Sequence, residues 1–159
     1  MASQVSAGIL LYRWHEGVLE VLLGHPGGPY FRNKDEGAWS IPKGLVDDGE
    51  SLEAAARREF EEEISYPPAG SLLDLGSIRP KSGKTIHIFA GEDDLPAGHR
   101  VESNTFAMEW PPRSGRTQEF PEMDGAAFFP LEQARKKINP KQALFLDRLA
   151  EALEIPRLG

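Results

Sequence analysis

The sequence contains no cysteine among its 159 residues. This absence excludes disulfide bonds, zinc sites built on thiolates and a thiol nucleophile, and it suits a reducing compartment. The four histidines do not lie at the spacing of metal ligands, and no serine lies in a nucleophile-elbow pattern. The sequence therefore disfavours zinc-dependent hydrolases and Ser-His-Asp hydrolases.

Long hydrophobic segments are also missing. The chain has no apolar run of about 18 residues, the length that indicates a membrane-spanning helix. Its N-terminus has neither the basic stretch nor the apolar core of a secretory signal. We therefore expect a soluble, cytoplasmic protein that does not associate with membranes.

Positive charge is scarce relative to negative charge, and the formal net charge is -7 at pH 7. An acidic chain is poorly suited to nonspecific binding of nucleic acids. A small phosphorylated partner remains compatible with this charge, because bound divalent metal ions reverse the local field. The length and a hydrophobic content of 40% predict one domain over residues 1–159. The oligomeric state is left open.

Periodic apolar residues predict an alternation of strands and helices, which indicates a mixed α/β fold. The long segment from Gly24 to Gly37 is expected to be a loop, and loops of this length are often functional. The Asn139-Pro140-Lys-Gln142 segment has the pattern of a helix start, with Gln142 completing a capping box. The strands are expected at residues 5–11, 18–23, 72–79, 85–90, 105–110 and 126–129, and the helices at 51–64, 131–138 and 139–153.

The helix expected after Ser51 is the most informative element. Ser51 is a suitable N-cap. Four residues at helical spacing form an apolar stripe that would anchor the helix to a core, namely Leu52, Ala56, Phe60 and Ile64.

A carboxylate stripe lies beside this apolar one. Glu59, Glu62 and Glu63 are spaced i, i+3 and i+4, so they share one face of the helix and repel each other. A cation between them reverses this repulsion, and clustered carboxylates are ligands of Mg²⁺ or Mn²⁺. The alternative is an acidic α/β protein in which these glutamates form only a solvated face.

The full pattern extends beyond these three residues. Gly44 is followed after five residues by Glu50 and, after seven more, by Arg58-Glu59-Phe60-x-Glu62-Glu63. This pattern resembles the signature of the Nudix (MutT-like) hydrolases. Ser65 occupies the position where the family usually has glycine, which affects the turn after the helix rather than the glutamates.

The resemblance implies a fold and an activity. The fold is an α/β/α sandwich around a mixed β-sheet. The activity is hydrolysis of a pyrophosphate bond in a nucleoside diphosphate linked to another moiety, with water attacking phosphorus. The cofactor is Mg²⁺ (or Mn²⁺), which neutralises the phosphates and activates the water. A catalytically weak domain that senses nucleotides is the alternative within the same family.

The resemblance also assigns roles to residues. Glu59, Glu62 and Glu63 would bind metal together with the Gly44 carbonyl, and Arg58 would orient the glutamates. Glu50 would either support the ligands or be a ligand itself.

A further glutamate, Glu122, precedes a segment that resembles the family more loosely. In the family, a glutamate at this place completes the metal site or acts as the base, so the base would be Glu62, Glu63 or Glu122. Glu119 competes with Glu122 for this role, and both are alternatively solvated loop acids.

Four residues are candidates for substrate binding. Lys43 and Lys84 are placed to contact phosphates, as is Arg32 in the long loop. Trp39 would stack on a base or belong to the core. The segment 37–44 is similar to that of Nudix proteins acting on diadenosine polyphosphates or nucleoside triphosphates, which makes these the favoured substrates. Damaged nucleotides, ADP-ribose, RNA 5′ ends and diphosphoinositol phosphates remain open.

Overall fold

The computed structural model describes residues 4–81 and 83–155. Its main sheet contains β1 (Val5–His15), β2 (Val18–Pro26), β3 (Lys43–Leu45), β4 (Leu73–Ile78), β5 (Thr85–Glu92) and β8 (Met123–Pro130). The strand order is β4-β5-β1-β2-β8, and β3 pairs with β1. Strands β1 and β5 run parallel, whereas the other pairs are antiparallel, so the sheet is mixed.

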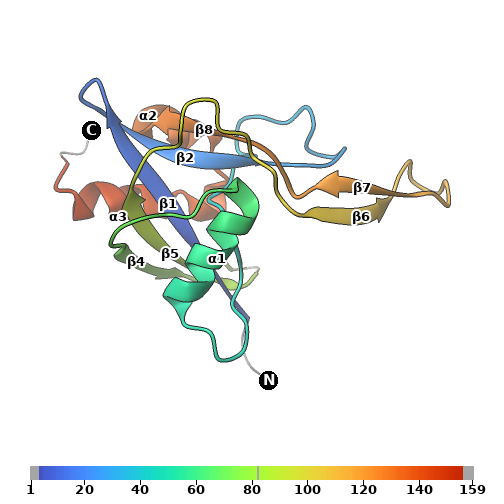
Figure 1. Cartoon of the computed structure of the whole chain (residues 1–159), viewed down its shortest axis with the longest axis horizontal. Coiled ribbons are helices and arrows are strands. Elements are labelled where there is room, and N and C mark those ends of the chain that lie inside the picture. Colours follow the sequence, from blue (N-terminus) through green and yellow to red (C-terminus); the bar gives the residue numbers. More distant parts are fainter. Residues whose placement is uncertain (1–3, 82, 156–159) are drawn as a thin grey trace.

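Helices cover both faces of this sheet (Figure 1). One face carries α1 (Leu52–Ile64). The other carries α2 (Leu131–Lys137), the 3₁₀ helix η1 (Pro140–Gln142) and α3 (Leu144–Ala152). The expected α/β/α sandwich around a mixed sheet is therefore confirmed.

The alternation of side chains along β1 divides the core into two layers. Ile9 and Leu11 pack with Phe60 of α1 in one layer. Leu10 packs with Phe145 of α3 in the other. Burial of these apolar side chains on both sides fixes the position of α1 against the sheet.

Ser51 caps α1 as expected, since its side chain accepts a hydrogen bond from the Ala54 amide at 3.1 Å. Three of the four residues of the apolar stripe are buried, but the prediction for Leu52 was wrong, because it is 36% exposed. Ala55 is buried instead. The first turn of α1 therefore extends beyond the edge of the core.

Ser65 keeps the turn that the family usually makes with glycine. It lies at the end of α1 with φ 62° and ψ 36°, in the left-handed region that residues other than glycine seldom adopt. Its hydroxyl donates to the Glu102 carbonyl at 2.7 Å and accepts from the Glu102 amide at 3.0 Å. These two bonds offset the conformational cost, so the turn survives without glycine.

Several boundaries differ from the sequence-based expectation. Strand β2 continues to Pro26, so the predicted loop begins later than Gly24, whose backbone pairs with Ser40. Gln142 does not complete a capping box. Its buried side chain accepts a hydrogen bond from the Ile41 amide at 2.8 Å and ties η1 to the segment before β3.

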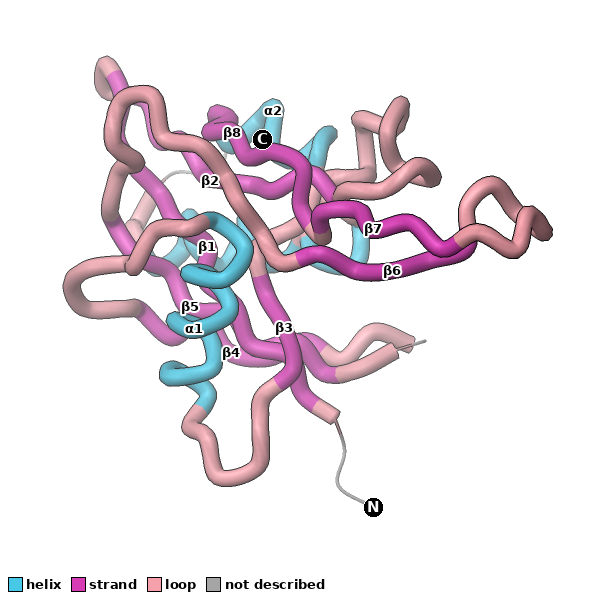
Figure 2. Tube along the Cα trace, turned by 45° about the vertical axis from the view of Figure 1, so that its right-hand side comes forward, coloured by secondary structure: helices cyan, strands magenta, loops and turns pink. Residues whose placement is uncertain are grey.

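The strand β7 (Thr117–Pro121) was not predicted. It pairs with β6 (Thr105–Glu109) in a separate two-stranded sheet that projects from the body as an arm (Figures 1 and 2). The ring of Tyr30 in the 27–37 loop packs edge-on against Trp110 at 5.3 Å, so the loop lies along this arm. Within the described residues, no helix is long and apolar enough to cross a membrane.

His25, near the end of β2, connects the same loop to β8 through its two ring nitrogens. Nδ1 lies 2.8 Å from Asp124 Oδ1, and Nε2 lies 2.6 Å from the Lys34 carbonyl oxygen. Both partners are acceptors, so the ring donates to both only as the imidazolium. Burial alone would lower the pKa of His25, but these bonds and the charge of Asp35 raise it above its ordinary value.

A pH dependence of stability follows from this geometry. Because the pKa of His25 is raised in the folded state, the bound proton stabilises the fold below the unfolded pKa of about 6.5. That stabilisation is lost as the pH rises through the folded pKa. We expect His25→Gln to lower the free energy of unfolding by about 1 kcal/mol at acidic pH and by less at alkaline pH. Urea unfolding across this range tests it, with exposed His15→Gln as the control. A wild-type-to-variant difference that does not change with pH would contradict the assignment.

Candidate active site

The predicted site residues converge where β3, α1 and the segment before β8 meet. Gly44 lies on β3, and its lack of a side chain allows Glu59 to approach. A Cβ atom on Gly44 would lie 2.1 Å from Glu59 Cδ, far inside van der Waals contact. The pair brings a backbone position and a carboxylate of the signature into direct contact.

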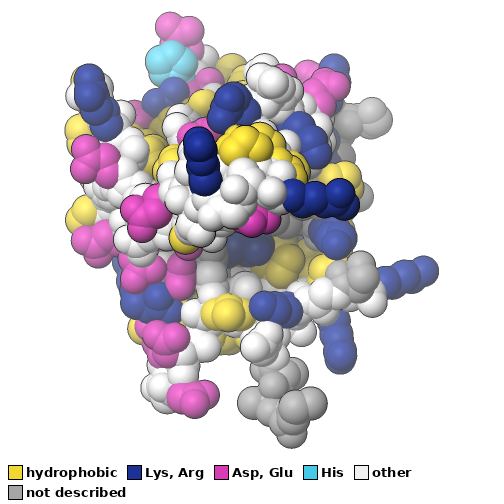
Figure 3. Space-filling model, turned by 90° about the vertical axis from the view of Figure 1, so that its right-hand side faces the viewer, with side chains coloured by type: hydrophobic (Ala, Val, Ile, Leu, Met, Phe, Trp, Pro, Cys, Tyr) yellow, Lys and Arg dark blue, Asp and Glu magenta, His cyan; other side chains and the backbone are white. Residues whose placement is uncertain are grey.

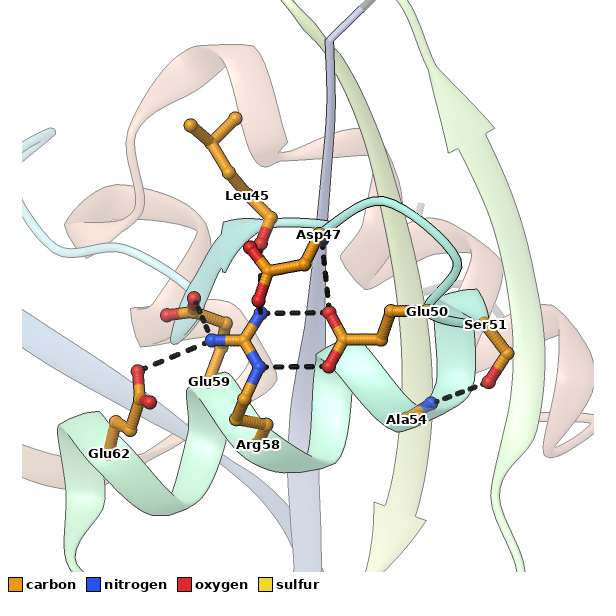
Figure 4. A network of polar contacts seen from close by, with 8 residues as sticks. All are labelled: Leu45, Asp47, Glu50, Ser51, Ala54, Arg58, Glu59 and Glu62. Atoms are coloured by element: carbon orange, nitrogen blue, oxygen red, sulfur yellow. Dashed lines mark hydrogen bonds and ion pairs between the residues drawn. The ribbon is translucent and has the colours of Figure 1, made fainter.

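Arg58 is the centre of the polar network on α1 (Figure 4). Its Nη1 donates to Glu59 Oε1 at 2.7 Å and lies 3.5 Å from Glu62 Oε2. Its Nη2 donates to the Leu45 carbonyl oxygen at 3.0 Å, which ties α1 to β3. The guanidinium therefore orients two signature glutamates, as the resemblance implied.

Glu50 closes the network from the other side. Arg58 Nε and Nη2 each donate to one Glu50 oxygen at 2.9 Å, and the Asp47 amide adds a third bond at 3.0 Å. These hydrogen bonds, those of Arg58 first, lower the pKa of Glu50 to about 2. Both oxygens are engaged, which favours a supporting role for Glu50 over direct metal binding.

Glu63 has the most unusual environment of the glutamates. One end of its carboxylate accepts a hydrogen bond from the Lys43 amide. Its Oε2 is buried and has no hydrogen-bond partner among the described residues. Burial, followed by the charge of Glu59, raises the pKa of Glu63 to about 8. An acceptor that is buried without a donor is costly, so this oxygen is suited to a ligand.

Glu59 is also surrounded by negative charge. Burial raises the pKa of Glu59 despite the opposing bond from Arg58, and the charges of Glu62 and Glu122 raise it further. The charge of Glu122 also raises the pKa of Glu63. Glu119 lies on the arm, exposed. The geometry therefore favours Glu122 over Glu119 for the fourth carboxylate.

The residues present fit a divalent cation. A buried carboxylate oxygen without a donor lies among several mutually repelling carboxylates, and carboxylate oxygens are ligands that Mg²⁺ and Mn²⁺ prefer. In residues 4–81 and 83–155, no three His, Asp or Glu side chains are already gathered as a metal site. Glu59 and Glu62 instead lie against the Arg58 guanidinium, at 2.7 and 3.5 Å.

The substrate-binding candidates separate in the structure. Lys43 and Lys84 line one cavity together with Gly44. Burial lowers the pKa of Lys43 and the charge of Lys84 lowers it further, whereas Glu63 opposes this. Arg32 is exposed on the 27–37 loop, and no contact brings it to the cavity. Trp39 packs edge-on against Phe129 at 4.9 Å, which favours the core interpretation.

Two neighbours of this cavity were missed from the sequence. Asn139 and Lys141 line it from the opposite side. Their segment was interpreted only as a helix start. The available signal was a lysine within a Pro-containing turn, which gives no indication that the turn faces β3.

The chain is similar to known proteins in both sequence and fold. A family model described as NUDIX domain matches residues 2–149. A putative 8-oxo-dGTP diphosphatase of Bacillus subtilis (strain 168) is 43% identical over 79 residues, which cover 50% of this chain and 53% of that protein. The aligned region thus spans about half the length of this curated relative.

Solved structures share the fold at low identity. An Ap4A hydrolase binary complex from C. elegans superposes with a TM-score of 0.67 at 22% identity, covering 94% of this chain and 98% of that one. The NUDIX domain of Shewanella oneidensis NrtR, complexed with ADP ribose, gives 0.67 at 17% identity, covering 96% and 90%. A mutT/nudix family protein from Listeria innocua gives 0.63 at 20% identity, covering 97% and 96%.

Proposed function

This chain belongs to the NUDIX domain family, and on that premise we propose that it is a Mg²⁺-dependent pyrophosphohydrolase. Its substrate is a nucleoside diphosphate linked to another moiety, with nucleoside triphosphates and dinucleoside polyphosphates as the first candidates. The relative named as a putative 8-oxo-dGTP diphosphatase, which aligns over about half of its length, supports a nucleotide substrate.

One observation carries the proposal. The buried Glu63 Oε2 has no hydrogen-bond partner in the described part of the chain, and it lies among other carboxylates. A protein gains no stability from such an arrangement, because like charges repel and a buried acceptor loses its water. A divalent cation resolves both costs at once.

The residues take distinct roles in this proposal. Glu59, Glu62, Glu63 and Glu122 hold the metal together with the Gly44 carbonyl. When bound, Mg²⁺ neutralises the phosphates and lowers the pKa of the attacking water.

Other residues position this set. Arg58 and its partner Glu50 hold α1 in register with β3 through the Leu45 carbonyl. The base that accepts the proton from water is Glu62, Glu63 or Glu122. Exposure favours Glu62 and Glu122, because Glu62 is 40% exposed, whereas the free oxygen of Glu63 is buried.

A substrate panel tests the proposal. Product release is measured with and without Mg²⁺ or Mn²⁺ on nucleoside triphosphates, oxidised deoxynucleotides, dinucleoside polyphosphates, ADP-ribose and diphosphoinositol phosphates. We expect metal-dependent turnover of one class. Metal and nucleotide binding without turnover would instead identify a sensor domain.

A further inference from the structure

The cavity beside Gly44 is rich in lysine. We call it the lysine pocket, and its volume is about 360 Å³. It is lined by Ser6, Lys43, Gly44, Leu45, Pro80, Gly83, Lys84, Ile86, Asn139, Lys141 and Gln142. No acidic side chain is among these described residues. In an acidic chain, three lysines around one cavity are a local reversal of charge.

The lysines come from three separate parts of the fold. Lys43 lies on β3, Lys84 just before β5, and Lys141 in η1. The face seen in Figure 3 shows Lys and Arg side chains gathered around the hollow below the arm. Acidic side chains gather toward the left edge of the same view. The fold thus assembles the lysines in space, although they are far apart in sequence.

The ammonium of Lys43 is half-buried, and the described residues provide it with no hydrogen bond or ion pair. Its interaction with Glu63 is electrostatic only, as is its repulsion from Lys84. Bringing two like charges together beside a cavity costs free energy, as it does for the glutamates nearby. An anion bound in the pocket reverses the sign of this interaction.

The amide side chains of the pocket are already engaged. Gln142 accepts from the Ile41 amide at 2.8 Å and donates to Ser40 Oγ at 3.0 Å. Asn139 accepts from the Lys141 amide at 3.0 Å. Both ends of Gln142 and the side-chain oxygen of Asn139 are therefore committed to the protein. Lys43 and Lys84 bring ammonium donors to the pocket, which suit a ligand that only accepts hydrogen bonds.

We propose that the lysine pocket binds a phosphate of the substrate other than the two joined by the scissile anhydride. Gly44 lines the pocket and contacts Glu59 of the carboxylate site, so the two sites adjoin. The substrate class is then a pyrophosphate compound with at least one additional phosphate. That phosphate belongs either to a longer polyphosphate chain or to a phosphomonoester on the organic moiety. This inference rests on the proposed hydrolysis and narrows its substrate.

Matched substrate pairs test this inference and separate the two sources. The chain arm compares diadenosine triphosphate with diadenosine diphosphate, which has no phosphate beyond the two of its scissile anhydride. The moiety arm compares coenzyme A with dephospho-coenzyme A, and NADPH with NADH. In one arm, the additional phosphate is expected to raise kcat/KM about tenfold or more, the scale of a charge-assisted hydrogen bond. Equal kcat/KM within every pair would overturn the proposal.

Lysine variants connect that preference to the pocket. Lys84→Gln and Lys141→Gln are expected to remove this preference by raising KM for the substrate that carries the additional phosphate. Lys81→Gln is the matched control, since Lys81 is an exposed lysine of the same β4–β5 turn outside the pocket lining. A preference that survives in both pocket variants, or that Lys81→Gln removes equally, places the phosphate elsewhere.

A binding measurement separates this inference from the hydrolase proposal. Inorganic tripolyphosphate is titrated calorimetrically into the protein without metal. We expect Lys84→Gln to weaken binding about tenfold and Glu62→Gln to leave it unchanged or stronger, because Glu62 repels the anion. If no substrate is turned over but this pattern holds, the pocket stands and the hydrolase proposal fails. If tripolyphosphate binds equally to wild type and Lys84→Gln, the pocket assignment is wrong.

Discussion

Glu62→Gln is expected to lower kcat by about 10²-fold or more while leaving the free energy of unfolding almost unchanged. The change keeps the shape of the side chain and removes one negative charge from the carboxylate cluster. The Glu62 side chain is 40% exposed, and the ion pair that it forms with Arg58 in the described part of the chain is long at 3.5 Å. Little folding energy depends on an exposed pair of this kind. Its proposed roles as metal ligand or base, by contrast, require the charge.

The adjacent residue provides a matched control. Glu61 is exposed on the same helix, and Glu61→Gln makes the same chemical change on a different face of α1. We expect wild-type kcat for Glu61→Gln, and a rise of melting temperature with Mg²⁺ that is smaller in Glu62→Gln than in Glu61→Gln. Comparable rates for the two variants under saturating Mg²⁺ would exclude Glu62 from the metal site and from the base.

Local sequence patterns explain why α1 and its glutamates were predictable. Helical periodicity places Glu59, Glu62 and Glu63 on one side, and it places Phe60 in the core. The structure agrees on these points because they depend only on residues within a few positions of each other. The prediction for Leu52 was wrong because the burial of this residue depends on where the sheet ends and not on the helix itself.

Contacts between distant segments account for what the sequence left open. The hairpin β6–β7 favours Glu122 over Glu119, because Glu119 lies on β7 in the arm and Glu122 lies directly before β8 of the main sheet. Strand β7 itself has no alternation of buried residues that marks it, because most of it is exposed on both sides. Its pairing with β6 is a property of the hairpin as a whole.

The lysine pocket also depends on contacts between distant segments, which local sequence patterns do not indicate. Lys43 and Lys84 were singled out as loop cations, but nothing in the sequence indicates that Lys141 joins them. That meeting depends on Gln142, whose buried amide fixes η1 against the segment before β3. A side chain that forms a tertiary contact was interpreted as a local cap, because a capping glutamine and a tertiary glutamine have the same sequence pattern.

Gly44→Ala is expected to lower turnover about 10²-fold and to weaken Mg²⁺ binding, with only a small change in stability. The added methyl would lie 2.1 Å from both Glu59 Cδ and Oε2 and 2.5 Å from Oε1. These atoms are at the end of a flexible side chain. Glu59 therefore rotates away, and β3 and α1 do not have to separate. Alanine restricts the unfolded chain more than glycine does, which offsets part of the cost.

Gly44→Ala tests the metal site separately from the fold. The added methyl moves the Glu59 carboxylate from its position without changing any charge. Gly125→Ala is the matched control, since a Cβ there meets no atom within 4 Å. Calorimetric titration of Mg²⁺, urea unfolding and turnover are measured on both variants. If Gly44→Ala matches Gly125→Ala in Mg²⁺ affinity and in rate, the contact between Gly44 and Glu59 serves packing alone. If it loses metal binding and turnover together and remains folded, the close approach of β3 to α1 exists to place the Glu59 carboxylate beside the Gly44 carbonyl.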